Sequence, residues 1–160
     1  MALVMPTSPA LLLTMFAGAL LYAAWGDIRT RTIPNTLNAA IALAAPLWWW
    51  TTGVDPWPNM AMHLAVGVAL FAVFAGFFAL GAMGGGDVKL VAAVGLWLPF
   101  GAIMPMLILM ALIGGVLTLV VLFAHRMAKK PGQPEVPYGV AIAAATLCII
   151  ANDILSTLAH

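Results

Sequence analysis

The chain has 160 residues, of which 64% are hydrophobic and 7% are charged, and its formal net charge at pH 7 is +1. Soluble globular domains carry about 25% charged residues, so this composition excludes a soluble globular domain. A net charge this small gives no reason to expect a polyanion, and no nucleic-acid partner is predicted.

Apolar runs recur about six times along the chain, and they approach the roughly 20 residues that cross a hydrocarbon core about 30 Å thick. They lack the alternation of membrane β-strands. The sequence therefore predicts an all-α, polytopic integral membrane protein with about six transmembrane helices, folded as one membrane-embedded domain over residues 1–160. The expected helices cover residues 9–25, 36–50, 60–80, 88–98, 105–124 and 138–157.

The first apolar run is expected to be a membrane helix, because no basic residue precedes it as in a cleaved signal peptide. A polar loop over residues 26–35 is expected to follow, and it contains Asp27. Pro34 in this loop disfavours helix before the second helix begins. Taken alone, Asp27 could simply pair at the surface with Arg29 or Arg31.

Tryptophans gather where the second helix is expected to end. Indole rings are enriched at membrane–water interfaces, where one edge is apolar and the other polar. The cluster is therefore predicted to anchor the chain at one membrane surface rather than to form a binding site. Its members are Trp48, Trp49, Trp50 and Trp57.

Three consecutive glycines, Gly84, Gly85 and Gly86, stand before Asp87 between the third and fourth runs. Glycines let another backbone approach closely and permit unusual dihedral angles, although a flexible turn explains them equally well. Asp87 could also cap a helix that starts at Val88. That fourth helix would rise only about 17 Å, so Asp87 could lie slightly below the membrane surface.

The last two runs flank the most polar loop of the chain, residues 125–137, which contains Glu135. The single cysteine, Cys148, lies in the last run. One cysteine excludes a disulfide framework and a cysteine-based zinc site. A buried, inert thiol is expected.

Loops counted alternately from the N-terminus place all six basic residues on one side of the membrane. The positive-inside rule assigns that side to the cytoplasm, so both termini are expected to face outward. Asp27 and Asp87 then share the cytoplasmic side, with Asp55 and Asp153 on the other. The six basic residues are Arg29, Arg31, Lys89, Arg126, Lys129 and Lys130.

Two aspartates on one side of an apolar protein indicate shared chemistry, because an acid at membrane depth is costly. Two close carboxylates do not both ionise readily, so the pair shares one proton. One member can then act as general base on water while the other donates to a carbonyl oxygen. Such hydrolysis needs neither metal nor cofactor, and none is predicted. The sequence leaves open which of Asp27 and Asp87 takes which role, and whether the pair forms without substrate.

Other kinds of site are less well supported. His63, His125 and His160 are spread over both sides of the membrane, so they do not predict a zinc site. The glycine-rich stretch lacks the Gly-Lys-Ser/Thr sequence of a phosphate-binding loop. The aspartate pair is therefore the candidate for chemistry.

At these residues the sequence resembles the type IV prepilin peptidases, membrane aspartic proteases with a Gly-x-Gly-Asp motif. Residues 84–87, Gly-Gly-Gly-Asp, match the motif, and Val-Lys-Leu at 88–90 continues it. Asp27 followed by Ile-Pro-Asn at 33–35 is similar to the first catalytic aspartate and its downstream sequence. Residues 136–139, Val-Pro-Tyr-Gly, resemble the family's Pro-Phe/Tyr-Gly element.

The resemblance implies an aspartic endopeptidase that removes a short basic leader from prepilins or pilin-like secretion subunits, with Asp27 and Asp87 as the catalytic pair. It places the protein in a bacterial or archaeal cytoplasmic membrane with the site facing the cytoplasm. The expected partners are the substrate, through its leader and apolar N-terminal helix, and the lipid bilayer, and a homodimer stays open. The candidate substrate-binding residues are Gly84, Gly85, Gly86, Lys89 and Glu135, the last as a counter-charge for the leader.

Larger members of that family carry an N-terminal region with paired cysteines that methylates the new N-terminus. The sequence has no such region, so it resembles the short peptidases of Flp-type (tight-adherence) pili or the archaeal preflagellin peptidases, and methylation is not expected. Intramembrane proteolysis of presenilin type would be a variant of the same Gly-x-Gly-Asp chemistry.

Two readings of a different kind stay open. A proton-coupled transporter or channel could use Asp27 and Asp87 as a relay, but it predicts ionisable groups throughout the bilayer depth, and most of the runs have almost none. A structural subunit of a secretion system would need neither aspartate.

Overall fold

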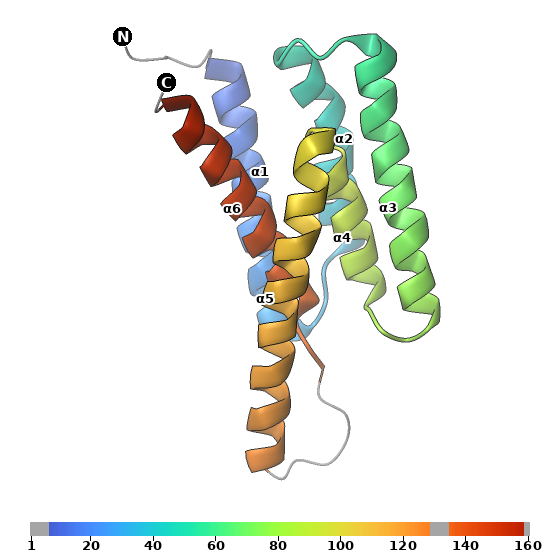
Figure 1. Ribbon diagram of the computed structural model, residues 1–160, viewed down its shortest axis with the longest axis vertical. Coiled ribbons are helices and arrows are strands. Elements are labelled where there is room, and N and C mark those ends of the chain that lie inside the picture. The colour runs from blue at the N-terminus through green and yellow to red at the C-terminus, as the bar shows by residue number, and fades with distance from the viewer. Residues whose placement is uncertain (1–6, 129–134, 159–160) are drawn as a thin grey trace.

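The computed structural model of the protein describes residues 7–128 and 135–158, and its regular elements there are all helical (Figure 1). Within these described residues, four helices are long and apolar enough to cross a membrane, in the ranges Ser8–Thr30, Pro56–Ala79, Phe100–Met127 and Tyr138–Thr157. The protein is thus an all-α polytopic membrane protein, as predicted. The elements are α1 (Thr7–Thr30), α2 (Asn35–Thr51), a short π-helical turn η1 (Pro56–Met60), α3 (Ala61–Ala79), α4 (Gly85–Gly95), α5 (Phe100–Met127) and α6 (Tyr138–Leu158).

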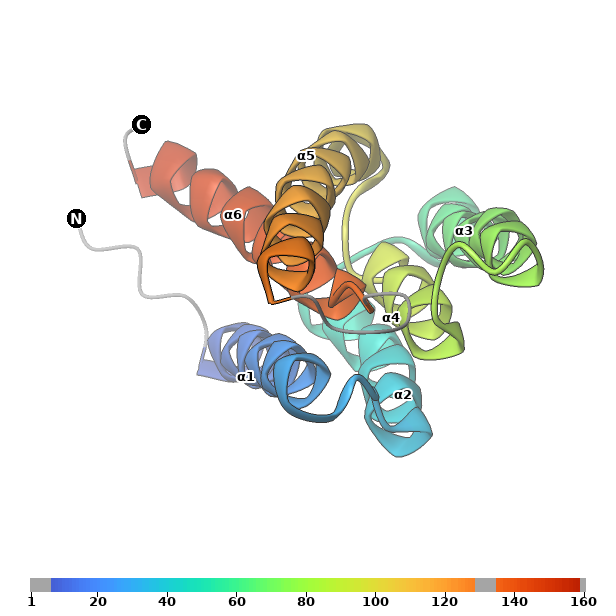
Figure 2. The same cartoon turned by 90° about the horizontal axis from the view of Figure 1, so that it is seen from below.

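The other two helices, α2 and α4, are shorter, with 17 and 11 residues. Figure 2 shows α4 enclosed between α2 and α3, and the first turns of α6 also pack against it. Its apolar side chains are accordingly buried on nearly every side. They are Val88, Leu90, Val91, Ala93 and Val94. A helix too short to span the membrane is thus held inside the protein by its neighbours.

Glycines let α3 and α4 approach each other closely. A Cβ added to Gly67 of α3 would lie 2.5 Å from Cδ2 of Leu96, and one added to Gly95 would lie 2.5 Å from Cδ1 of Leu70. Each glycine therefore receives a leucine of the opposite segment, as small residues do at helix contacts in membranes. This packing fixes the position of α4, and with it that of Asp87.

The helix ends sort into two groups (Figure 1). The start of α1 and the end of α6 lie at one end of the bundle, whereas the end of α1, the α3–α4 turn and the end of α5 lie toward the other. Arg29, Lys89 and Arg126 belong to elements of this second group. Lys129 and Lys130 of the predicted basic set lie outside the described residues.

The boundaries of three helices differ from the prediction by more than one residue. The first helix continues beyond residue 25 to Thr30, because Gly26 does not interrupt it. It ends where Arg31 adopts a left-handed φ of 55°. Asp27 therefore lies in the last turn of α1, not in a loop. The fourth helix starts at Gly85 rather than 88, so Asp87 lies in its first turn and is not its N-cap. The fifth begins at Phe100 and includes Pro105.

The tryptophan cluster is only partly the predicted surface anchor. Trp50 and Trp57 are more than 80% exposed, as anchors would be. Trp49, in contrast, is buried, and its Nε1 donates a hydrogen bond of 2.7 Å to the carbonyl oxygen of Leu96. Trp48 stacks on Trp97 with ring centroids 5.7 Å apart. These two indoles face the bundle because the turn after α4 comes against α2, which the sequence pattern did not reveal.

The prediction that the Cys148 thiol is buried is wrong, because Cys148 is exposed on α6. An apolar run has no polar face to mark its outer side, so the burial of a single position cannot be read from it.

Trp49→Phe should lower the free energy of unfolding of the detergent-solubilised protein by about 1–3 kcal/mol, because the Leu96 carbonyl oxygen loses the hydrogen bond from the Trp49 indole. Trp50→Phe, the same change at the exposed neighbouring position, should leave the unfolding temperature unchanged. Thermal unfolding of the two variants side by side checks this. Equal shifts would mean that Trp49 contributes only as a surface anchor.

Candidate active site

Asp27 is held between α1 and α6. The residue is 4% exposed, and its Oδ2 accepts a hydrogen bond of 2.7 Å from the backbone N–H of Gly139 in the first turn of α6. The guanidinium of Arg29 lies elsewhere, 4.5 Å over the ring of Trp25. Asp27 is therefore a buried carboxylate bound by a backbone donor. Arg31 interacts with it electrostatically, but Asp27 is not the surface partner of an arginine that was the alternative.

Asp87 reaches the same place from α4. It is 8% exposed and interacts with the backbone of Gly84 and of Gly139, the residue that also donates to Asp27. Its Oδ1 is buried and has no hydrogen-bond partner among the described residues. The fold thus brings Asp27 and Asp87 together around one backbone N–H.

The surroundings of Asp87 favour its neutral form. Burial, and secondarily the charge of Asp27, raises the pKa of the Asp87 carboxyl from 3.8 to about 7. Asp87 lies outside the four membrane-spanning ranges, in the first turn of the short helix α4. Two carboxyl groups this close do not both ionise readily, and burial favours a proton on Asp87 below about pH 7.

The three glycines before Asp87 are packed against their own chain to different degrees. Gly84 is exposed, and a Cβ added there would lie 2.9 Å from Oδ2 of Asp87. A Cβ added to Gly86 would lie 3.2 Å from Cβ of Ile33, and one added to Gly85 would lie 3.4 Å from the ring of Phe78. Of the three, Gly84 has the open side on which a substrate backbone could approach Asp87.

The other two predicted binding residues are at the periphery. Lys89 is exposed, and its Nζ donates a 2.7 Å hydrogen bond to Oδ1 of Asn35 at the start of α2. Glu135 is exposed and precedes Gly139 by four residues. Lys89 therefore borders the site between α2 and α4, whereas Glu135 lies in the segment that leads into α6.

Gly139 and Asn38 also lie at the aspartate pair, although neither carries an ionisable group that would mark it in the sequence. Gly139 entered only as part of a sequence resemblance, although a glycine in the first turn of an apolar helix can signal a close approach. Asn38 is an uncharged polar residue inside an apolar run, which requires a partner. It is 4% exposed, and its Nδ2 donates a 3.0 Å hydrogen bond to the carbonyl oxygen of Gly86.

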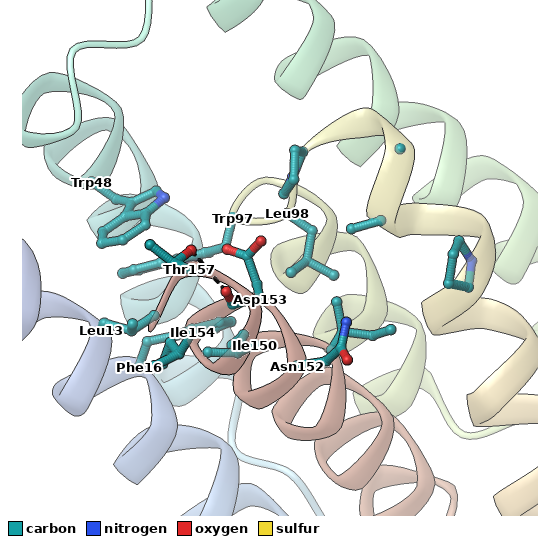
Figure 3. A pocket seen from close by; sticks show the side chains of 15 residues that line it. Leu13, Phe16, Trp48, Trp97, Leu98, Ile150, Asn152, Asp153, Ile154 and Thr157 are labelled. Carbon is teal, nitrogen blue, oxygen red and sulfur yellow. Dashed lines mark hydrogen bonds between the residues drawn. The ribbon is translucent and has the colours of Figure 1, made fainter. Parts of the chain in front are cut away.

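Figure 3 shows a cavity of about 410 Å³ whose lining includes neither Asp27 nor Asp87. It opens between Leu13 and Phe16 of α1 and Ile150 and Asp153 of α6, about 20 Å along α1 from Asp27. Its walls are mainly apolar. No three histidine, cysteine or acidic side chains of the described residues, here or at the aspartate pair, are grouped to hold a metal ion.

The sequence model of the type IV leader peptidase family matches residues 14–119 of the chain. The matched range contains Asp27, Asn38 and Asp87 and ends before Gly139. No match was found among curated proteins or among solved structures.

Proposed function

Because the chain belongs to the type IV leader peptidase family and is a polytopic membrane protease, we propose that it is an aspartic endopeptidase. Its substrates are type IV prepilins or pilin-like proteins, from which it removes the short basic leader. The observation that carries the aspartic mechanism is the meeting of two buried carboxylates, Asp27 and Asp87, at the N–H of Gly139.

The environments of the two carboxyl groups favour different roles. The Gly139 N–H stabilises a negative charge on Asp27, so Asp27 is the general base and takes a proton from the attacking water. The water oxygen bonds to the scissile carbonyl carbon while protonated Asp87 donates its proton to the carbonyl oxygen. In the second step the C–N bond breaks, Asp27 passes its proton to the leaving nitrogen, and Asp87 recovers a proton from the diol.

The proposal includes an orientation. The elements that carry Arg29, Lys89 and Arg126 reach toward the same end of the bundle as the last turn of α1 with Asp27. By the positive-inside rule that end faces the cytoplasm. The active site would then act at the cytoplasmic face of a bacterial or archaeal cytoplasmic membrane, with both chain ends outside.

Purified protein in detergent, mixed with a full-length type IV prepilin, tests the function directly. We expect a product shorter by the leader alone, as measured by mass spectrometry. The same product should form in EDTA, because the aspartate pair activates water without a metal. An uncleaved prepilin would contradict the function, and cleavage lost in EDTA would contradict the aspartic mechanism alone.

The proton on Asp87 predicts a pH dependence. The pair is active with one proton, so kcat/KM should fall as pH rises through about 7 and the Asp87 carboxyl ionises. Initial rates of prepilin cleavage between pH 5.5 and 9 check this, with circular dichroism at each pH to confirm that the protein stays folded. A rate constant that is flat up to pH 9 would remove Asp87 from the role of acid.

A further inference from the structure

A groove with a volume of about 690 Å³ lies near the active site, between α2, α3 and α4. It extends over about 10 Å, or two helical turns, from residue 35 to residue 42 of α2. Lys89 and Asn35 border its end nearest to Asp87. Apart from Asn38, the remaining lining is apolar: Ala39, Ala42, Leu64, Gly67, Val68, Phe71, Ala92, Ala93 and Leu96.

Asn38 is the exception in this apolar lining. Its Nδ2 is bound to the carbonyl oxygen of Gly86, which can only accept, so the orientation of the amide is fixed. Its Oδ1 is left without a partner among the described residues, although the side chain is 96% buried. An acceptor buried without a donor is costly, so a ligand that brought a donor to this oxygen would remove that cost.

The groove is connected to the active site through Asn38, which lines it. Gly86, to which Asn38 is bound, is the residue before Asp87. On the outer side the groove is bordered by exposed apolar residues of α3, Leu64, Val68 and Phe71. A ligand in it would thus be apolar along most of its length and would present a backbone donor beside the catalytic pair.

Given the proposed function, we propose that this groove binds the apolar segment of the prepilin that follows the scissile bond, and that Oδ1 of Asn38 accepts a hydrogen bond from a backbone N–H of that segment. The first N–H groups of any helix have no partner within the helix, and in a membrane they must find one. Cleavage leaves the start of such an apolar helix beside Asp87, which is where Asn38 offers its acceptor.

Photocrosslinking tests the occupant without requiring cleavage. Benzoylphenylalanine is placed at position 39 or 68 in the groove, or at position 69, which is exposed on α3 but does not line it. The Asp27→Asn background keeps the prepilin intact. We expect crosslinks to the apolar segment of the prepilin from 39 and 68 and none from 69. Equal crosslinking at all three positions, or none, would overturn the groove while leaving the cleavage assay to decide the function.

Filling the groove gives a kinetic test. Ala39→Phe should raise KM for full-length prepilin about tenfold and leave kcat unchanged, because it removes binding that is equal in ground and transition states. Ala69→Phe, the same change outside the groove, should alter neither constant. If Ala39→Phe processes prepilin as wild type does, the groove is not the binding site, even though the protein is a peptidase.

A double-variant cycle isolates the Asn38 acceptor from its bond to Gly86. Asn38→Ala should lower kcat/KM roughly five- to hundred-fold, and so should replacing one of the first four amides after the scissile bond by an ester, which removes that N–H. If Oδ1 accepts a hydrogen bond from this N–H, making both changes should lower kcat/KM no further than the more damaging of the two changes alone. Losses that multiply for all four esters would show that Asn38 acts only by holding Gly86.

Discussion

Asp27→Asn and Asp87→Asn should each lower the cleavage of a co-expressed prepilin by roughly a thousandfold or more, because neither the base nor the acid of the pair can be replaced by an amide. Full-length precursor should accumulate in both variants, as followed by immunoblot. The effect is the largest we expect for any single change, since both carboxyl groups act on the reacting atoms.

Asp55→Asn is the matched control. Asp55 is exposed before η1 and makes no side-chain capping bond, so the same change there should leave processing normal.

The stability of the variants is tested separately. Because the pKa of Asp87 is raised, folding stability falls as pH rises from about 4 through about 7, and Asp87→Asn should remove this loss. If Asp87→Asn is inactive but its unfolding temperature at pH 8 is unchanged or higher, the loss of activity comes from the missing carboxyl group and not from unfolding. Active asparagine variants would refute the pair and favour a relay or a structural subunit.

Gly139→Ala should lower kcat roughly a hundredfold with little change in KM, because displacement of a catalytic group by about 1 Å has effects of this size. The added Cβ would lie 2.9 Å from Oδ2 and 3.2 Å from Cβ of Asp27, and 2.7 Å from Cδ1 of Ile33. The isoleucine methyl can move aside, but Asp27 is fixed by the packing of α1 on α6. Its carboxylate must therefore leave the Gly139 N–H.

Two further variants identify the cause of that loss. Gly18→Ala in α1, where nothing lies within 4 Å of the added Cβ, should be as active as wild type. Ile33→Val removes the Cδ1 contact alone, so combining it with Gly139→Ala should leave most of the defect. Full recovery in the double variant would show that Ile33, not Asp27, is what the alanine displaces.

The membrane class, the helical fold and the two aspartates could be predicted from the sequence. A hydrocarbon core requires every backbone group to be bonded within the chain, so long apolar runs leave only helices. A carboxylate in such a chain is costly wherever it lies, which made Asp27 and Asp87 candidates before any contact was known. The shortness of α4 could also be predicted, because the fourth expected helix covered only residues 88–98.

What the tertiary structure decided is the environment of each group. Asp27 and its hydrogen-bond donor Gly139 are 112 residues apart in the chain, and no local pattern connects them. The burial of Trp49 and the unpartnered oxygen of Asn38 likewise depend on α4 and the turn after it packing against α2. Apolar residues surround each of these helices, so hydropathy marks that a helix is in the membrane but not which face meets which neighbour. Which aspartate holds the proton is therefore a property of the packed bundle, not of either residue.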